Sequence, residues 1–175
     1  MEHREFLAAF LRNLGSQLLK RGRPAEALDA YGRSYTLLEQ LVKENPADKG
    51  YVSNQIQSLV RRGRARRALG DLAGAAADVR QALRLYEWRE SLGAFSIACA
   101  HAALAGLAGQ EGTGVSAAEG KAHADQAMAL LRKAVDGFRN IHLYRTEGAL
   151  DPLREREDFK KLLTELEQKS AAKPK

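Results

Sequence analysis

The sequence predicts an all-α protein made of repeated helical hairpins. Hydrophobic residues make up 45% of the 175 residues, many of them alanine, while aromatic residues make up only 6% and there are four prolines. This composition favours helices packed through small side chains over a β-sandwich. Apolar residues recur at three- and four-residue steps, and a pattern of small residues returns after 48 residues. We therefore expect an α-α superhelix of about three hairpins with a C-terminal capping helix.

The repeat is clearest around the turn of the first hairpin, at Gly15, Gly22 and Ala27. A small residue such as Gly15 lets two antiparallel helices approach closely, and Gly22 permits the turn between them. The residues found 48 positions later are Gly63, Gly70 and Ala75. The same close approach and the same turn are therefore expected in a second hairpin.

The first hairpin is expected over residues 4–44. Its apolar residues are spaced three and four apart and predict an amphipathic helix that ends at Gly22. Pro24 opens the next helix, where its missing N–H and fixed φ cost nothing. Asn45 and Pro46 end that helix, because the residue before a proline is pushed out of the helical region.

The second hairpin is expected over residues 50–90, with Gly70 and Asp71 ending its first helix and capping its second. Its first helix carries Arg62 and Arg66 at positions where the first hairpin has leucines. Two interpretations stay open. Either the helix turns this face outward, or the arginine stems lie along apolar surface with their charged heads in water.

The third hairpin is expected over residues 92–137. Compared with the first hairpin, its turn carries a 17-residue insertion, and five glycines fall within residues 106–120. We expect a mobile surface loop here, followed by a helix over residues 117–137.

Residues 138–168 predict a short helix, a turn and a last amphipathic helix. Such a segment can cover the exposed apolar end of a helical repeat array. Residues 1–168 are therefore expected to form a single domain. Residues 169–175 are expected to be a disordered tail.

Several short runs of residues resemble the tetratricopeptide (TPR) repeats. In the first half these are Asn13-Leu14-Gly15, the run from Gly22 to Leu28, and Glu44-Asn45-Pro46-Ala47. In the second half they are Ile97 to Ala100, Gly112 to Ala118, Ala127 to Val135, and Leu150 to Leu153 followed by Asp158-Phe159. More narrowly, these runs resemble the long C-terminal repeats of large bacterial, planctomycete-type serine/threonine kinases. The resemblance implies a TPR-like solenoid that binds partners.

In this repeat class, the first helix of each hairpin is implied to line a concave groove. That face corresponds here to Arg12, Ser16, Leu19 and Lys20 in the first hairpin, Gln57, Arg61, Arg64 and Arg67 in the second, and Phe95 and Cys99 in the third. Some family members are implied to hold a peptide's terminal carboxylate between Lys and Asn residues. Only Arg12 and Arg64 match that pattern in part, so the clamp is not supported residue by residue, which leaves a looser acidic ligand of the groove.

The net charge is +6, and residues 56–90 carry +4 of it because eight arginines there face four acidic residues. Guanidinium groups bind carboxylates bidentately, so an acidic peptide suits this face. A solvated basic face is the alternative. Nucleic acid is not favoured, because neither stacking aromatic residues nor a recognisable reading element accompanies the cluster.

We expect a non-catalytic protein-interaction module that binds a peptide or partner segment of acidic character. One alternative is self-association, or a scaffold role, through exposed ends of the solenoid. Another is a small-molecule or enzyme site near Cys99 under the glycine-rich loop. Cys99 and His101 are two residues apart and do not face each other on a helix, so they make a poor nucleophile and base pair.

No cofactor or metal is expected, because the four histidines are scattered without the spacing of metal ligands. We find no uninterrupted apolar run of about 18 residues. The first residues also lack the basic-then-apolar order of a secretion signal. A lone cysteine, Cys99, fits a reducing compartment. We therefore expect a cytoplasmic chain that does not bind a membrane.

Overall fold

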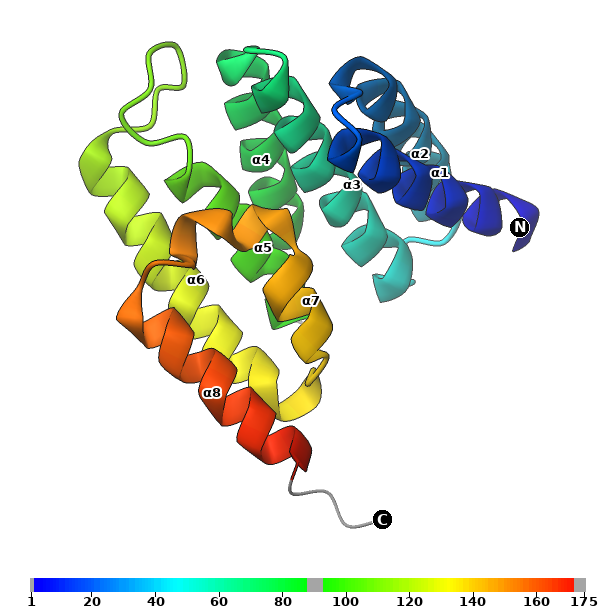
Figure 1. Ribbon diagram of the computed structural model, residues 1–175. Coiled ribbons are helices and arrows are strands. Elements are labelled where there is room, and N and C mark those ends of the chain that lie inside the picture. Colours follow the sequence, from blue (N-terminus) through cyan, green and yellow to red (C-terminus); the bar gives the residue numbers. More distant parts are fainter. Residues whose placement is uncertain (1, 88–92, 172–175) are drawn as a thin grey trace.

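The computed structural model describes residues 2–87 and 93–171, and every regular element within these ranges is helical (Figure 1). This confirms the all-α prediction. The elements are α1 (Glu2–Lys20), α2 (Pro24–Glu44), α3 (Lys49–Ala68), α4 (Leu72–Glu87), α5 (Ala94–Ala105), α6 (Ala117–Gly137), α7 (Ile141–Thr146), the 3-10 helix η1 (Gly148–Leu153) and α8 (Glu157–Ala171).

The helix ends follow local rules that the sequence shows. Gly22 and Gly70 have φ values of 71° and 81°, in the left-handed region that glycine adopts without strain. Asp48 begins α3 by accepting hydrogen bonds from the N–H groups of Gly50 and Tyr51. The expected boundary between the second and third hairpins, at residues 90–92, lies outside the described residues. The described chain resumes at Gly93.

Helices that follow each other in the chain pack together. The pairs α1 and α2, α3 and α4, and α5 and α6 form three hairpins in the described part of the chain, and α2 and α4 each contact the next hairpin. The small residues allow this closeness. A Cβ added at Gly15 would lie 2.8 Å from the Tyr31 ring, and one at Gly63 would lie 3.1 Å from the Ala75 carbonyl oxygen. The superhelical, TPR-like arrangement of these hairpins stays a prediction.

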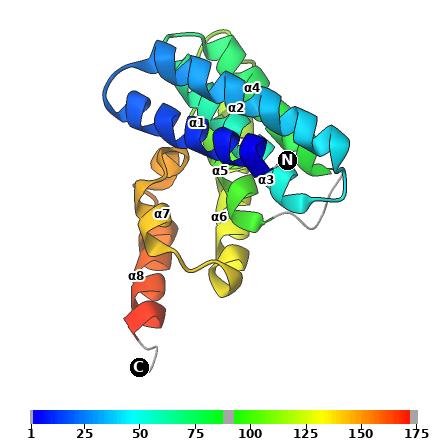
Figure 2. The ribbon, with the colours of Figure 1, turned by 90° about the vertical axis from the view of Figure 1, so that its right-hand side faces the viewer.

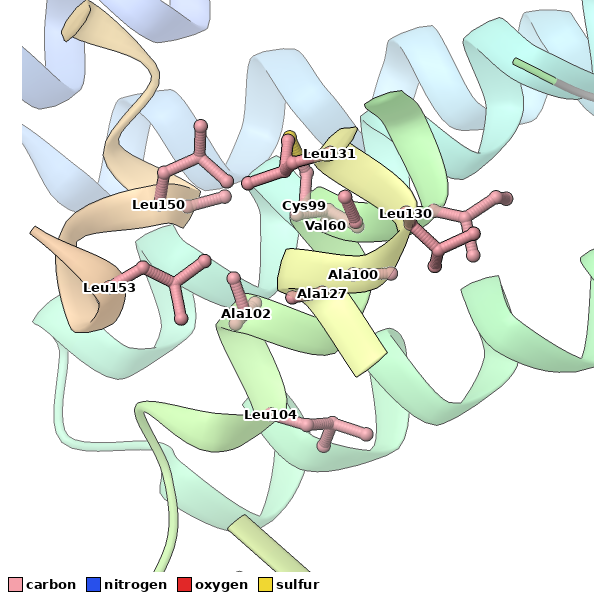
Figure 3. Close-up of a cluster of buried hydrophobic side chains, with 14 of the residues drawn as sticks. Val60, Cys99, Ala100, Ala102, Leu104, Ala127, Leu130, Leu131, Leu150 and Leu153 are labelled. Carbon is pink, nitrogen blue, oxygen red and sulfur yellow. The ribbon is translucent and has the colours of Figure 1, made fainter. Parts of the chain in front are cut away.

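The largest apolar core lies among α3 to α6 and the C-terminal segment. Figure 3 shows Leu150 and Leu153 pointing from η1 toward α5, where Cys99 and Ala102 lie. All four side chains are buried. The C-terminal segment is therefore part of the same core as the second and third hairpins.

The C-terminal segment does more than the expected end cap. Its last helix, α8, packs against α6 and α7, and buries Phe159, Leu162 and Leu166. The segment before it folds back instead, so that η1 contacts both α3 and α5 (Figures 1 and 2). α8 also includes residues 169–171 of the stretch expected to be disordered, while residues 172–175 lie outside the described residues.

The insertion between α5 and α6 makes specific contacts with the rest of the fold, and its expected mobility stays a prediction. Arg80 on α4 donates hydrogen bonds to the carbonyl oxygens of Thr113, at 2.9 Å, and Gly114, at 2.7 Å. The side chains of Thr113 and Val115 are buried. Ser116 then begins α6 with a capping box, so the helix starts at the predicted residue.

Within residues 2–87 and 93–171, none of the helices combines the length and apolar character that a membrane span requires. The helices are instead amphipathic or pack through small residues, as the first hairpin illustrates. Its α2 buries Ala27, Ala30 and Tyr31 against α1 and α3 while exposing charged side chains.

Candidate functional site

Arg62 and Arg66, the two arginines whose orientation the sequence left open, pack between α3 and α4. Arg62 makes a bidentate ion pair with the buried Asp78, with Nη2 2.6 Å from Oδ1 and Nε 2.9 Å from Oδ2. Its guanidinium also lies 4.8 Å from the centroid of the Tyr35 ring. Arg66 donates to the carbonyl oxygen of Gly74 and lies 3.4 Å from the same aspartate. These heads are paired with protein groups, so neither arginine belongs to a ligand-binding face.

Arg61 and Arg64, by contrast, converge on one carboxylate from the C-terminal segment. Arg61 Nη2 lies 3.1 Å from Glu147 Oε2, and Arg64 Nη1 lies 3.1 Å from Glu147 Oε1. The two arginines are three residues apart and therefore share a helix face. Glu147 stands between α7 and η1, where its Oε1 also accepts the N–H of Ala149. Its side chain is 11% exposed, so this charge is largely removed from water.

Arg12 brings a third guanidinium to this place from α1. Its Nη1 atom is buried and has no hydrogen-bond partner among the described residues. Burial, and then the nearby charge of Arg61, lower the pKa of Arg12 to about 10. Ser16 donates to the Arg12 carbonyl oxygen at 3.1 Å and accepts a hydrogen bond from Tyr31. An unpartnered buried guanidinium beside a second cation is costly, and an anion would relieve that cost.

Phe95 supplies the aromatic part of the site. Its ring centroid lies 4.8 Å from that of Phe138 and 4.9 Å from that of Tyr144, which is fully buried. Beside Phe95, Gln57 on α3 donates a hydrogen bond to Ser96 Oγ on α5 at 3.2 Å. Phe95, which the sequence placed on the groove face, is therefore partly covered by the chain's own C-terminal segment.

Two clefts follow one another along α3, with the ion pairs to Glu147 between them. The first has a volume of about 510 Å³ and is lined by residues that include Gln57, Arg61, Phe95, Cys99 and Lys133. The second is smaller, at about 290 Å³, and its lining includes Arg64, Arg67, Gly148 and Pro152. The C-terminal segment thus divides the predicted groove without filling it.

The structure brings most of the predicted site residues together. Those that gather around Glu147 and the first cleft are Arg12, Ser16, Gln57, Arg61, Arg64 and Phe95. Lys20 is exposed and makes no ion pair in the described structure, and the exposed Arg67 lines only the second cleft. Lys20 is therefore the predicted residue that this site does not recruit.

Sequence reasoning missed the groove-facing side of the C-terminal segment, namely Phe138, Tyr144 and Glu147. The usable signal was that two aromatic residues, with Ile141 and Leu143 between them, lie within a short stretch, since aromatic side chains need a surface to bury against. Nothing in the sequence pairs that stretch with α3 and α5. The contact is tertiary, and the short α7 carries little periodicity of its own.

Cys99 lies at the floor of the first cleft but is chemically protected. Burial raises the pKa of its thiol well above the ordinary value, so it stays protonated at neutral pH. His101 faces His123 instead, with their Nδ1 atoms 2.8 Å apart. Cys99 is therefore a small buried side chain, 6% exposed. Residues 106–116 contribute nothing to the lining of this cleft, so the glycine-rich loop does not cover it.

The described residues contain no group of three or more His, Cys, Asp or Glu side chains placed to hold a metal ion. Comparisons with protein-family models, curated proteins and solved structures find no match for the chain. The site is therefore defined by its own geometry: a helical groove with clustered guanidinium groups, an apolar cleft and one internal carboxylate.

Proposed function

We propose that this chain is a non-catalytic protein-interaction module of the TPR-like type, and that its groove binds an acidic peptide segment. The observation that carries the proposal is the docking of Glu147 between Arg61 and Arg64. A peptide-like segment of the chain, with an aromatic residue three positions before its carboxylate, lies against α3 and α5. The groove therefore suits a segment of this chemistry.

The groove stays cationic after this internal pairing. Arg61 and Arg64 share the single carboxylate of Glu147, and Arg12 beside Arg61 has a buried Nη1 without a hydrogen-bond partner among the described residues. At the edges of the two clefts, Lys133 and Arg67 make no ion pair with any described acidic residue. A partner with several Asp or Glu residues would meet these unpaired charges, while the first cleft offers apolar surface for an anchoring side chain.

Affinity would come from several weak contacts added to that anchor. Exposed ion pairs contribute only about 0.2–1 kcal/mol each, so neither Lys133 nor Arg67 would dominate. Nucleic acid is a weaker fit, because the aromatic rings near the basic cluster contact one another in tilted pairs instead of forming a row of separate stacking platforms.

The test is the binding of a fluorescent peptide that contains an aromatic residue and several Asp and Glu residues, measured by anisotropy. Arg67→Glu with Lys133→Glu should weaken binding about tenfold, since two favourable contacts become repulsive. Both side chains lack internal ion pairs in the described structure, so the fold should be unaffected. Reversing Arg64 would be a poorer test, because it would also repel Glu147.

The matched control is Arg33→Glu with Arg84→Glu, which makes the same change in net charge on exposed positions of α2 and α4. This variant should bind almost as well as the parent chain. Equal binding of a peptide in which Asn and Gln replace every acid would refute the proposal. Equal losses in both double variants would show that only net charge matters.

A further inference from the structure

One face of α1 carries large apolar side chains that the fold leaves in water. Phe6 is 75% exposed and Phe10 54%, while Leu7 and Leu14 are about 40% exposed. Phe6, Phe10 and Leu14 are four residues apart and line up along the helix. We call Phe6, Leu7, Phe10 and Leu14 the α1 stripe. In Figure 2, α1 lies at the edge of the molecule that faces the viewer.

The internal repeat shows what such a face does in the second hairpin. The residues 48 positions after the α1 stripe are Asn54, Gln55, Ser58 and Arg62 on α3. This face of α3 packs against α2: Ser58 Oγ lies 3.1 Å from Ser34 Oγ, and Arg62 lies over Tyr35. The covered face of α3 is thus polar, whereas the uncovered face of α1 is apolar. Burial within one chain would favour the reverse, an apolar covered face and a polar exposed one. The exposed apolar face of α1 therefore indicates that a helix of another molecule covers it.

The other end of the helical array offers no matching surface. There α8 packs on α6 and buries Phe159 and the leucines near it. Besides the α1 stripe, the only strongly exposed large apolar residue in the described chain is Leu69, in the turn after α3. Head-to-tail stacking of copies therefore finds no second stripe of exposed large apolar side chains in the described chain, whereas a symmetric contact buries the stripe of one copy on the stripe of another.

The pattern of α1 suits that symmetric contact. Positions four and seven residues from Phe10 carry similar residues: Phe6 corresponds to Leu14, and the uncharged polar His3 corresponds to Gln17. A two-fold axis at Phe10 would therefore place Phe6 against Leu14 in the middle and His3 against Gln17 at the ends, while Leu7 would lie opposite the uncharged Asn13. None of these residues is an acid, an arginine or a lysine, so no strongly charged groups of like sign would face each other.

We propose that two copies of the chain associate through α1, antiparallel, with a two-fold axis near Phe10. This goes beyond the proposed peptide binding and does not depend on it. Arg12 and Ser16 point to the groove on another side of α1, so the dimer leaves the groove open.

Sedimentation velocity on the full chain over a range of concentrations tests the proposal. Phe6→Glu with Phe10→Glu should weaken association by more than about 100-fold, because both copies lose two buried aromatic rings. Helicity should stay the same, since both side chains are exposed in one copy. The melting temperature should match that of the parent chain at concentrations where the parent is monomeric. Leu69→Glu is the matched control, and it should associate as the parent chain does.

Cysteine crosslinking tests the register. Phe10→Cys should form a disulfide with its counterpart under mild oxidation, because the axis brings residue 10 of both copies together. Asp29→Cys, exposed on α2, should not crosslink, and the buried Cys99 should not compete. A parent chain that stays monomeric, or a Phe6 and Phe10 variant that still associates, overturns the proposal. Association without the Phe10→Cys crosslink overturns the antiparallel arrangement.

Discussion

At the scale of single residues, Glu147 controls the groove. Its carboxylate separates the guanidinium groups of Arg61 and Arg64, and Arg12 lies near Arg61 with a buried, unpartnered Nη1. Removing one partner of a buried ion pair leaves the other charges uncompensated. The residue therefore has a structural role, and under the proposed function it would also occupy cations that an acidic partner could use.

Glu147→Gln should lower the free energy of unfolding and raise affinity for an acidic peptide. The expected loss is about 2 kcal/mol, less than for a fully buried pair because the arginines are partly exposed. Urea unfolding measures the first effect and peptide anisotropy the second. Adding Arg12→Gln should restore part of the stability, since it removes one of the repelling cations. Unchanged peptide affinity in the single variant would show that Glu147 does not compete.

The facing histidines of α5 and α6 predict a pH dependence of stability. Burial, and then the nearby His123, lower the pKa of His101 from 6.5 to about 4. Above pH 6.5, His101 is mainly neutral in both the folded and the unfolded chain. Between there and pH 4, the unfolded chain binds a proton that the folded chain excludes, so stability falls as pH falls.

We expect the free energy of unfolding to fall by about 1–3 kcal/mol across this window. Chemical unfolding at several pH values measures it, and His101→Gln should flatten the profile between pH 6.5 and 4. His142→Gln, which changes an exposed histidine on α7, should keep the profile of the parent chain. An identical slope in the His101 variant would mean that other groups cause the pH dependence.

At the scale of elements, the helices were predictable because their signals are local. The glycine turns, Pro24, and the capping box at Ser116 each act within a few residues, and α6 begins and ends where its apolar pattern indicates. The loop at 106–116 and the path of 138–153 were not predictable in the same way. Both are fixed by residues distant in sequence, Arg80 for the loop and the α3 arginines for Glu147.

The contacts of Arg80 predict how the glycine-rich loop opens. Arg80→Ala removes two hydrogen bonds from a charged donor to loop carbonyl groups. Local opening, and therefore cleavage within residues 106–116 by a nonspecific protease, should become about tenfold faster. Mass spectrometry of the early fragments locates the cut. Arg84→Ala, an exposed arginine one turn along α4, should leave the rate unchanged; if both variants are cut equally fast, Arg80 does not hold the loop.

At the scale of the whole molecule, the two contacts proposed for α1 lie on different faces of one helix. The candidate site was predictable where it follows the repeat, since Arg12, Arg61 and Arg64 occupy the faces that the first helices turn to the groove. It was not predictable where the chain departs from the repeat, as in the C-terminal segment. The α1 stripe is a second departure, because its apolar residues stand where α3 has polar ones.

Rising salt concentration should affect the two proposed contacts of α1 in opposite directions. The groove attracts acids through charges at partly exposed positions, and the Debye length shortens from about 10 Å at 0.1 M to about 3 Å at 1 M salt. Acidic peptide should therefore bind more weakly as salt rises. The α1 stripe is apolar, and burial of apolar surface is not screened, so the dimer should persist or tighten. Anisotropy and sedimentation velocity on the same samples, in sodium chloride and then in sodium sulfate, measure both. A dimer that dissociates in step with the peptide would place charged groups in its interface and contradict the contact centred on Phe10.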